Sequence, residues 1–149
     1  MRIVVQRVLW AKVEVNGEIV GQIGKGLLVY ASVGQGDDLE DVKFTADKIV
    51  GMRIFEDSGG KMNLSAEDVG GEILLVSNFT LHGDCRKGRR PGFDAAAKPP
   101  MANEMFEQLV ELVKQSGLKV EKGVFGANMA VESVNDGPIN ILLDSKRLF

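Results

Sequence analysis

Hydrophobic and polar positions in the first part of the chain predict a β-rich start. Residues 2–8 and 11–16 are predicted as two strands, and in the second of them apolar and polar side chains alternate strictly. Asn16-Gly17 is a two-residue turn of the kind favoured in hairpins, and residues 18–23 form the predicted return strand. The unbroken apolar run at residues 27–33 indicates a strand that is covered on both faces.

Two later stretches have the apolar spacing of amphipathic helices. The first is predicted to begin at Asp37, with Glu40 three residues on as its capping-box partner. The second is predicted over residues 101–116 and stops before Gly117. Their apolar stripes consist of Leu39, Val42, Ala46, Ile49 and Val50 in the first helix, and Met105, Phe106, Leu109, Leu112 and Val113 in the second.

The remaining segments complete a β-rich pattern. Residues 72–79 are predicted as another buried strand, and residues 82–100 as a loop rich in glycine, proline and charge, whose length is itself a hint of function. Three closing strands are predicted at residues 119–122, 129–134 and 138–143. Asn135-Asp136-Gly137-Pro138 then has the composition of an ordinary turn between the last two. The pattern predicts a single α/β domain over residues 1–149, with two helices.

The composition limits the cellular compartments and the binding partners that we expect for this protein. The 149 residues are enough to bury a real core, and no run approaches the roughly 20 apolar residues of a membrane span. The start lacks the pattern of a signal peptide, and the one cysteine, Cys85, cannot close an internal disulfide. We therefore expect a cytoplasmic protein that does not enter a membrane. The net charge of -3 argues against a protein that coats nucleic acid through a basic surface, but it allows a local basic patch.

One basic cluster stands out in this acidic chain. Four cations fall within five positions of the long loop, with Gly88 among them and Pro91-Gly92 after them. The cluster consists of Arg86, Lys87, Arg89 and Arg90. Such a loop is either simply solvated or holds phosphates of a nucleic acid, and the sequence favours neither interpretation over the other.

Few side chains offer catalytic chemistry. His82 and Cys85 are the only histidine and the only cysteine, and a Cys–His nucleophile pair is conceivable. No orienting partner is evident for them, so an incidental pair in a surface loop is the favoured interpretation. Two ligands are too few for a zinc site, and we expect neither a metal nor a cofactor.

The segment Ser77-Asn78-Phe79-Thr80-Leu81 ends a predicted buried strand, where active sites are common. His82 is the only imidazole base that the chain offers, so we predict no classical Ser-His-Asp triad. If this strand end is catalytic, backbone N–H groups must do much of the chemistry by stabilising an oxyanion. The alternative is that these polar side chains only satisfy their own backbone.

At this point the sequence resembles a known family, the bacterial-type D-aminoacyl-tRNA deacylases. The family motif Ser-Gln-x-Thr-Leu corresponds to Ser77–Leu81, and its motif Asn-x-Gly-Pro-Val/Phe-Thr corresponds to Asn135–Asn140. Other matches are Gln6-Arg7-Val8, Gly24-x-Gly26-Leu27-Leu28-Val29, Arg53-Ile54-Phe55, Gly60–Leu64 and Arg90-Pro91-x-Phe93. Their order and spacing make the resemblance specific. It implies a fold of layered, barrel-like sheets flanked by two helices.

The resemblance also implies an activity and an assembly. The expected reaction is hydrolysis of the ester bond of D-aminoacyl-tRNA, and of mischarged glycyl-tRNA, by a homodimer. Gly137-Pro138, joined by a cis bond, is expected to enter the pocket of the partner subunit and to exclude L side chains. Arg7 and Asn135 are expected to support this segment, and Phe125 and Met129 to wall the pocket.

The same resemblance makes Ser77, Asn78, Phe79 and Thr80 the expected catalytic segment. The backbone at Phe79 and Thr80 would stabilise the oxyanion, while the 2′-hydroxyl of the tRNA assists the attacking water. A nucleophilic Thr80 hydroxyl is the alternative mechanism. The basic cluster Arg86–Arg90 would contact tRNA phosphates.

The chain departs from the family motifs twice, with Asn78 in place of glutamine and Asn140 in place of threonine. Two other functions therefore stay open. One is a related enzyme that edits a different mischarged aminoacyl-tRNA, and the other is a non-catalytic dimer that binds tRNA ends.

Overall fold

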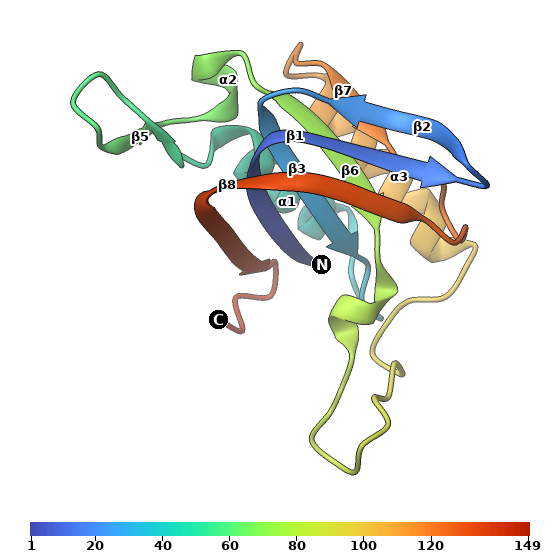
Figure 1. Cartoon of the computed structure of the whole chain (residues 1–149). Coiled ribbons are helices and arrows are strands. Elements are labelled where there is room, and N and C mark those ends of the chain that lie inside the picture. The colour runs from blue at the N-terminus through green and yellow to red at the C-terminus, as the bar shows by residue number, and fades with distance from the viewer.

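A computed structural model describes residues 1–149, and its centre is one strongly curved sheet (Figure 1). The strand order is β2-β1-β3-β6-β7, and β8 pairs with the other edge of β1. These strands are β1 Arg2–Val15, β2 Glu18–Ile23, β3 Gly26–Ser32, β6 Glu72–Ser77, β7 Val120–Lys122 and β8 Ala130–Asp144. A separate two-stranded ribbon consists of β4 Phe55–Glu56 and β5 Met62–Leu64.

The first strand is longer than predicted. Instead of two strands, residues 2–15 form one, which pairs antiparallel with β3 through its first half and with β2 through its second half. Leu9 and Trp10, which separate the two predicted strands, lie where the register with β8 shifts between Val8 and Trp10. The interruption in the pattern is therefore an irregularity within one strand and not a turn.

The predicted turn near the end of the chain is likewise part of a strand. β8 runs without a break through Asn135–Asn140, so the prediction of two closing strands with a turn between them was wrong. Asn140 pairs with Gln6 and Asn135 with Val8, so only Arg7 stands opposite the four residues between them. These four residues form a bulge. The peptide bond before Pro138 is cis, as is the one before Pro100.

Apolar side chains fill both faces of the central strands, as the run at residues 27–33 predicted. Leu27 and Val29 point into a large cluster under the helices, and Leu28 points into a second cluster inside the curl of the sheet. Close packing of β2 on β7 brings the sheet near to closure, since a Cβ on Gly21 would lie 2.8 Å from the carbonyl oxygen of Lys122. The barrel-like α/β fold is thereby confirmed.

Both predicted long helices are present, and they pack against each other over the large cluster (Figure 1). They are α1 Leu39–Gly51 and α3 Met101–Lys114. The sequence missed a one-turn helix, α2 Ala66–Val69, which Ser65 caps in a capping box with Asp68. No helix of the chain is long and apolar enough to cross a membrane.

The cap of α1 lies one residue later than predicted. Asp38 is the N-cap and Asp41 completes the capping box, so the expected pair of Asp37 and Glu40 was wrong. The carboxylate of Asp37 is instead buried, 2.7 Å from the amino group of Met1 and 2.6 Å from the backbone N of Gly34. A carboxylate engaged in this way is not available to cap the helix.

Candidate functional site

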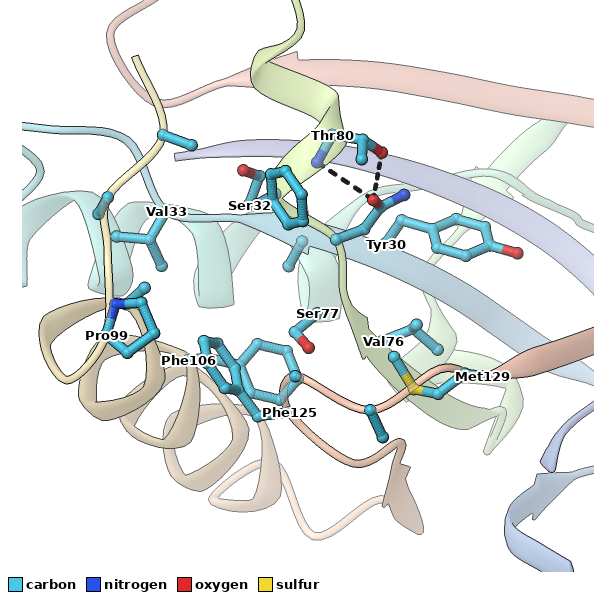
Figure 2. A pocket seen from close by; sticks show the side chains of 18 of the residues that line it. Tyr30, Ser32, Val33, Val76, Ser77, Thr80, Pro99, Phe106, Phe125 and Met129 are labelled. Carbon is cyan, nitrogen blue, oxygen red and sulfur yellow. Dashed lines mark hydrogen bonds between the residues drawn. The ribbon is translucent and has the colours of Figure 1, made fainter. Parts of the chain in front are cut away.

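A cavity of about 680 Å³ opens where the parallel strands β3 and β6 end (Figure 2). Ligands commonly bind beyond the carboxyl ends of parallel strands. The first turns of α3, the loop at residues 93–99 and the segment at residues 125–129 complete its walls. Since 14 of its 22 lining residues are hydrophobic, the cavity can bury an organic ligand and orient it through a few polar groups.

The expected catalytic segment lines this cavity. Ser77 ends β6, and the chain then enters a 3₁₀ turn, η1 Phe79–His82, so all four residues from Ser77 to Thr80 contact the cavity. Asn78 caps this turn: its Oδ1 accepts from the backbone N of Thr80 at 3.2 Å and from the hydroxyl of Thr80 (dashed lines in Figure 2). The first N–H of a helical turn has no partner inside the turn, which leaves that of Phe79 available.

This arrangement decides what the segment can do chemically. The Thr80 hydroxyl donates to an amide oxygen, and an amide oxygen is not a base that could activate it. The N–H of Phe79, and that of Thr80 once a ligand displaces the amide of Asn78, can instead stabilise a negative oxygen. By its geometry the segment can offer hydrogen-bond donors to a negative oxygen more readily than an activated nucleophile.

Two aromatic rings from different segments meet in the lining of the cavity. The side chain of Phe79 is 58% exposed, and its ring meets that of Phe93 edge to face, with centroids 5.1 Å apart. Phe93 belongs to the long loop, so this contact holds the loop against the 3₁₀ turn. The sequence matched Phe93 to a family motif but assigned it no place in the site.

The expected wall residues are in the wall. The ring of Phe125 packs in a tilted arrangement against that of Phe106 of α3, with the ring centroids 6.4 Å apart (Figure 2). Met129 lines the cavity just before β8 begins. A Cβ on Gly123 would lie 2.6 Å from the sulfur of Met129, so glycine at that position leaves room for the wall. Sequence reasoning missed the contributions of Tyr30, Ser32, Val76 and Phe106, although the ends of parallel strands could have indicated the first three.

His82 is not the surface residue that the sequence suggested. Its side chain is buried, with 8% of the residue exposed, and its Nδ1 lies 2.6 Å from Oγ of Ser32. Cys85 is exposed in the loop that follows, so the two do not form a Cys–His pair. The interpretation as an incidental surface pair is therefore wrong for His82, which has the orienting partner that the sequence did not reveal.

The segment around Gly137 and Pro138 lies outside the cavity of its own chain. Asn135 ties it down by donating to the carbonyl of Arg7 at 2.9 Å. The buried guanidinium of Arg7 lies 3.1 Å from Oδ2 of Asp136, close enough for an ion pair although the N–H is not in line for a hydrogen bond. Both Gly137 and Pro138 are exposed.

The basic cluster lies on a narrow loop that projects from the body of the protein (Figure 1, yellow-green). Asp84 and Gly92 close its base with two backbone hydrogen bonds of 2.7 and 2.9 Å. Arg86 is engaged with the carboxylate of Asp84 through two bonds of 2.8 and 2.6 Å, which holds the pKa of Asp84 well below its usual range. Lys87, Arg89 and Arg90 are exposed and form no ion pair. Three free cations therefore remain of the four.

No group of three or more His, Cys, Asp or Glu side chains is arranged to hold a metal ion. The lining of the cavity is likewise poor in charge, with Lys98 as its one charged residue. The chemistry available at the site is that of backbone donors, hydroxyls and a largely apolar wall.

The comparisons with known proteins agree with this geometry. The chain is 59% identical to a D-aminoacyl-tRNA deacylase of Halothermothrix orenii and 56% identical to one of Thermosipho africanus, with all of each chain covered. A solved structure of a c-Myc DNA unwinding element binding protein superposes with a TM-score of 0.91 at 36% identity, covering 97% of this chain and 98% of that one. A probable eukaryotic D-amino acid tRNA deacylase, 17% identical with a TM-score of 0.80 and covering 95% of this chain and 97% of that one, shares the fold.

The sequence profile of one family, D-Tyr-tRNA(Tyr) deacylase, matches residues 4–144. This match spans every residue that lines the cavity, from Tyr30 to Val131. Relatives that are more than 50% identical over the full chain support the same family assignment. The chain belongs to the D-Tyr-tRNA(Tyr) deacylase family.

Proposed function

We propose that this protein hydrolyses the ester bond of D-aminoacyl-tRNA, releasing the D-amino acid and free tRNA. The observation that carries the proposal is the strand end Ser77–Thr80, which lines a largely apolar cavity and in which the Thr80 hydroxyl meets an amide oxygen instead of a base. The names of the close relatives support the same activity.

The proposed chemistry uses the backbone and the substrate. Water attacks the ester carbonyl, and its proton passes toward the neighbouring 2′-hydroxyl of the terminal ribose. The negative oxygen of the tetrahedral intermediate is held by the N–H of Phe79, joined by that of Thr80 when the long bond to Asn78 opens. The C–O bond to the 3′-oxygen then breaks, and the 2′-hydroxyl, having taken the proton of the water, passes one proton on to the 3′-oxygen, which leaves as the tRNA hydroxyl.

Selectivity for the D hand is proposed to come from a second copy of the chain. Gly137 and Pro138 of the partner would enter the cavity, bind the α-amino side of the substrate through their carbonyls and leave no room for an L side chain. Glycine has no side chain to exclude, so glycyl-tRNA is also a proposed substrate. Both residues are exposed and neither lines the cavity of its own chain, which supports a role in a partner.

A homodimer is proposed for the same reason. Several large apolar side chains on β1 and β8 are exposed in the single chain, and exposed apolar patches commonly mark interfaces. They are Leu9 at 50%, Trp10 at 37%, Val134 at 38% and Leu142 at 64%. Trp10 and Val134 are cross-strand neighbours, so they form one continuous surface.

The rest of the tRNA is proposed to meet the projecting loop. Lys87, Arg89 and Arg90 carry unpaired positive charge on this loop, where they could bind phosphates. The proposed compartment is the cytoplasm, where an exposed thiol such as that of Cys85 stays reduced.

The deciding experiment is a deacylation assay with one tRNA charged in three ways: with a D-amino acid, with its L form and with glycine. The proposal expects rapid cleavage of the D and glycyl esters and an intact L ester. Cleavage of the L ester would point to a different editing enzyme. Binding of the tRNA without cleavage of any of the three esters would point to a tRNA-end-binding protein. Either result would refute the proposal.

A further inference from the structure

We infer that His82 is a positioning residue, whose neutral imidazole ties the 3₁₀ turn η1 to the end of β3 and so fixes the N–H groups of Phe79 and Thr80 at the cavity. The inference rests on the proposed function of those two N–H groups. His82 does not line the cavity and acts on the reaction only through the turn.

The turn is tied to β3 at both of its ends. At its start the backbone N of Asn78 donates to the carbonyl of Ala31 at 2.8 Å. At its end Nδ1 of His82 lies 2.6 Å from Oγ of Ser32, the last residue of β3. Phe79 and Thr80 lie between these two ties. Losing the second tie leaves the oxyanion donors attached to the strand at one end only.

The imidazole is held from its other side as well. A Cβ on Gly34 would lie 2.9 Å from Nε2 of His82 and 3.3 Å from Oδ2 of Asp37, so the backbone passes directly against the ring. Arg2 adds a further contact to the turn, because its Nη1 donates to the carbonyl of Leu81 at 3.3 Å. The ring therefore sits in a fitted slot and not in a loose surface loop.

Four charged groups face this slot from the elements around it. Arg2 comes from β1, the amino group of Met1 from the chain start, Asp37 from the segment before α1, and Asp144 from the end of β8. Burial and then Arg2 lower the pKa of His82, with Asp37 and Asp144 opposing them more weakly. The ring is therefore neutral at neutral pH, and protonation places a buried cation beside Arg2.

This arrangement predicts an acid-sensitive turnover. Protonation of the ring places a positive charge beside Arg2 inside the slot and thereby loosens the turn. We therefore expect kcat to fall when the pH drops below the ordinary histidine pKa of about 6.5. KM for the tRNA changes little, because the charges proposed to bind its phosphates lie on the projecting loop. A misplaced donor commonly costs a large factor in rate, and we expect a loss of roughly 10- to 100-fold in kcat.

The test compares three variants across about pH 5.5 to 8. His82→Ala should lose kcat at neutral pH with KM unchanged, and Ser32→Ala should behave similarly. His82→Asn, whose amide can reach the Ser32 hydroxyl, should recover most of the lost kcat but show no acid step. Ile49→Val in the core of α1 is the matched control, which removes buried volume elsewhere and should keep the acid step. The substrate amine also titrates, and taking variant-to-wild-type ratios cancels it.

A second readout is independent of activity. His82 is the only histidine, so its imidazole gives a single NMR titration curve. The amide signals of Phe79 and Thr80 should follow that curve. If the amide chemical shifts of Phe79 and Thr80 do not change with the His82 titration, or if His82→Ala keeps the wild-type kcat, the inference is overturned and the proposed function still stands. Failure of the wild-type protein to cleave D-aminoacyl-tRNA would instead overturn the proposed function, and this inference with it.

Discussion

The side chain of Asn78 explains how a departure from the family motif fits into this site. Glutamine stands at this position in the family pattern, and the shorter asparagine reaches back to cap its own turn. Asparagine is a preferred capping residue because its amide oxygen accepts from N–H groups two or three positions on. The same amide oxygen also accepts from the Thr80 hydroxyl, so this hydroxyl is engaged and not activated as a nucleophile.

Thr80→Ala should therefore retain deacylase activity within about tenfold of the wild type, since the backbone donors remain. Single-turnover deacylation of a D-aminoacyl-tRNA measures this directly. Cys85→Ala, a change in the exposed loop, serves as the control. Abolished turnover in a folded Thr80→Ala protein that still binds substrate, or a covalent aminoacyl group trapped on Thr80, would establish the nucleophile mechanism instead.

The substrate hydroxyl offers a complementary prediction. A tRNA that ends in 2′-deoxyadenosine and is charged on its 3′-hydroxyl should be cleaved very slowly, because the site has no side-chain base to replace the missing group. Binding of this tRNA, measured in parallel, should be nearly unchanged. Rapid cleavage of the deoxy substrate would mean that a protein group activates the water.

The buried histidine also bears on stability. Its pKa is lowered in the folded protein, mainly by burial, so the unfolded chain binds the proton more readily. The free energy of unfolding should thus be unaffected by His82 above about pH 6.5 and fall as the pH drops below that value. Chemical denaturation at several pH values measures the trend. His82→Asn should remove this component, and an equal slope in both proteins would contradict the assignment.

At the scale of elements, the sequence predicted most strands and both long helices but not where they join. The alternation around Leu9 and Trp10 breaks, and a local pattern cannot tell a register shift within a strand from a turn. The bulge at residues 136–139 has the composition of a turn, and for the same reason the local pattern could not identify it as part of a strand. Its place inside β8 depends on pairing with β1, which is a contact between the two ends of the chain.

The site shows the same division between local and distant information. Ser77–Thr80, Phe125 and Met129 were predicted to form the site through the family resemblance, and the structure brings them together in one cavity. The slot around His82 could not be predicted, because Ser32 lies 50 positions away and nothing in either local sequence links them. The pairing of Arg86 with Asp84 was also missed, although the two are only two positions apart.

The projecting loop gives a prediction for a whole element. Neutralising Lys87, Arg89 and Arg90 together should weaken tRNA binding and reduce the slope of log affinity against log salt by roughly two to three. Adding an Arg86→Gln change should reduce it little further, because Asp84 already neutralises that guanidinium. Binding titrations at several salt concentrations measure both. An unchanged slope in the triple variant would mean that the loop is merely solvated.

At the scale of the whole molecule, the exposed apolar side chains on β1 and β8 predict a homodimer. Light scattering should give twice the chain mass of 16.2 kDa. Trp10→Lys should give a folded monomer with little activity, since each cavity would lose the partner's Gly137 and Pro138. Leu39→Lys, a comparable change on the exposed side of α1, should stay dimeric. A fully active wild-type monomer would contradict the shared site.

The pairing of β1 with β8 has a consequence for synthesis. Arg2 pairs with Asp144, 142 positions later, and β1 has no other neighbour on that edge. A ribosome that adds about 5–20 residues each second needs roughly 7–30 s to bridge that interval. Throughout this time the nascent chain exposes an apolar strand edge on which other chains can pair. Chaperones that cover such edges are therefore expected to act on this protein before β8 leaves the exit tunnel.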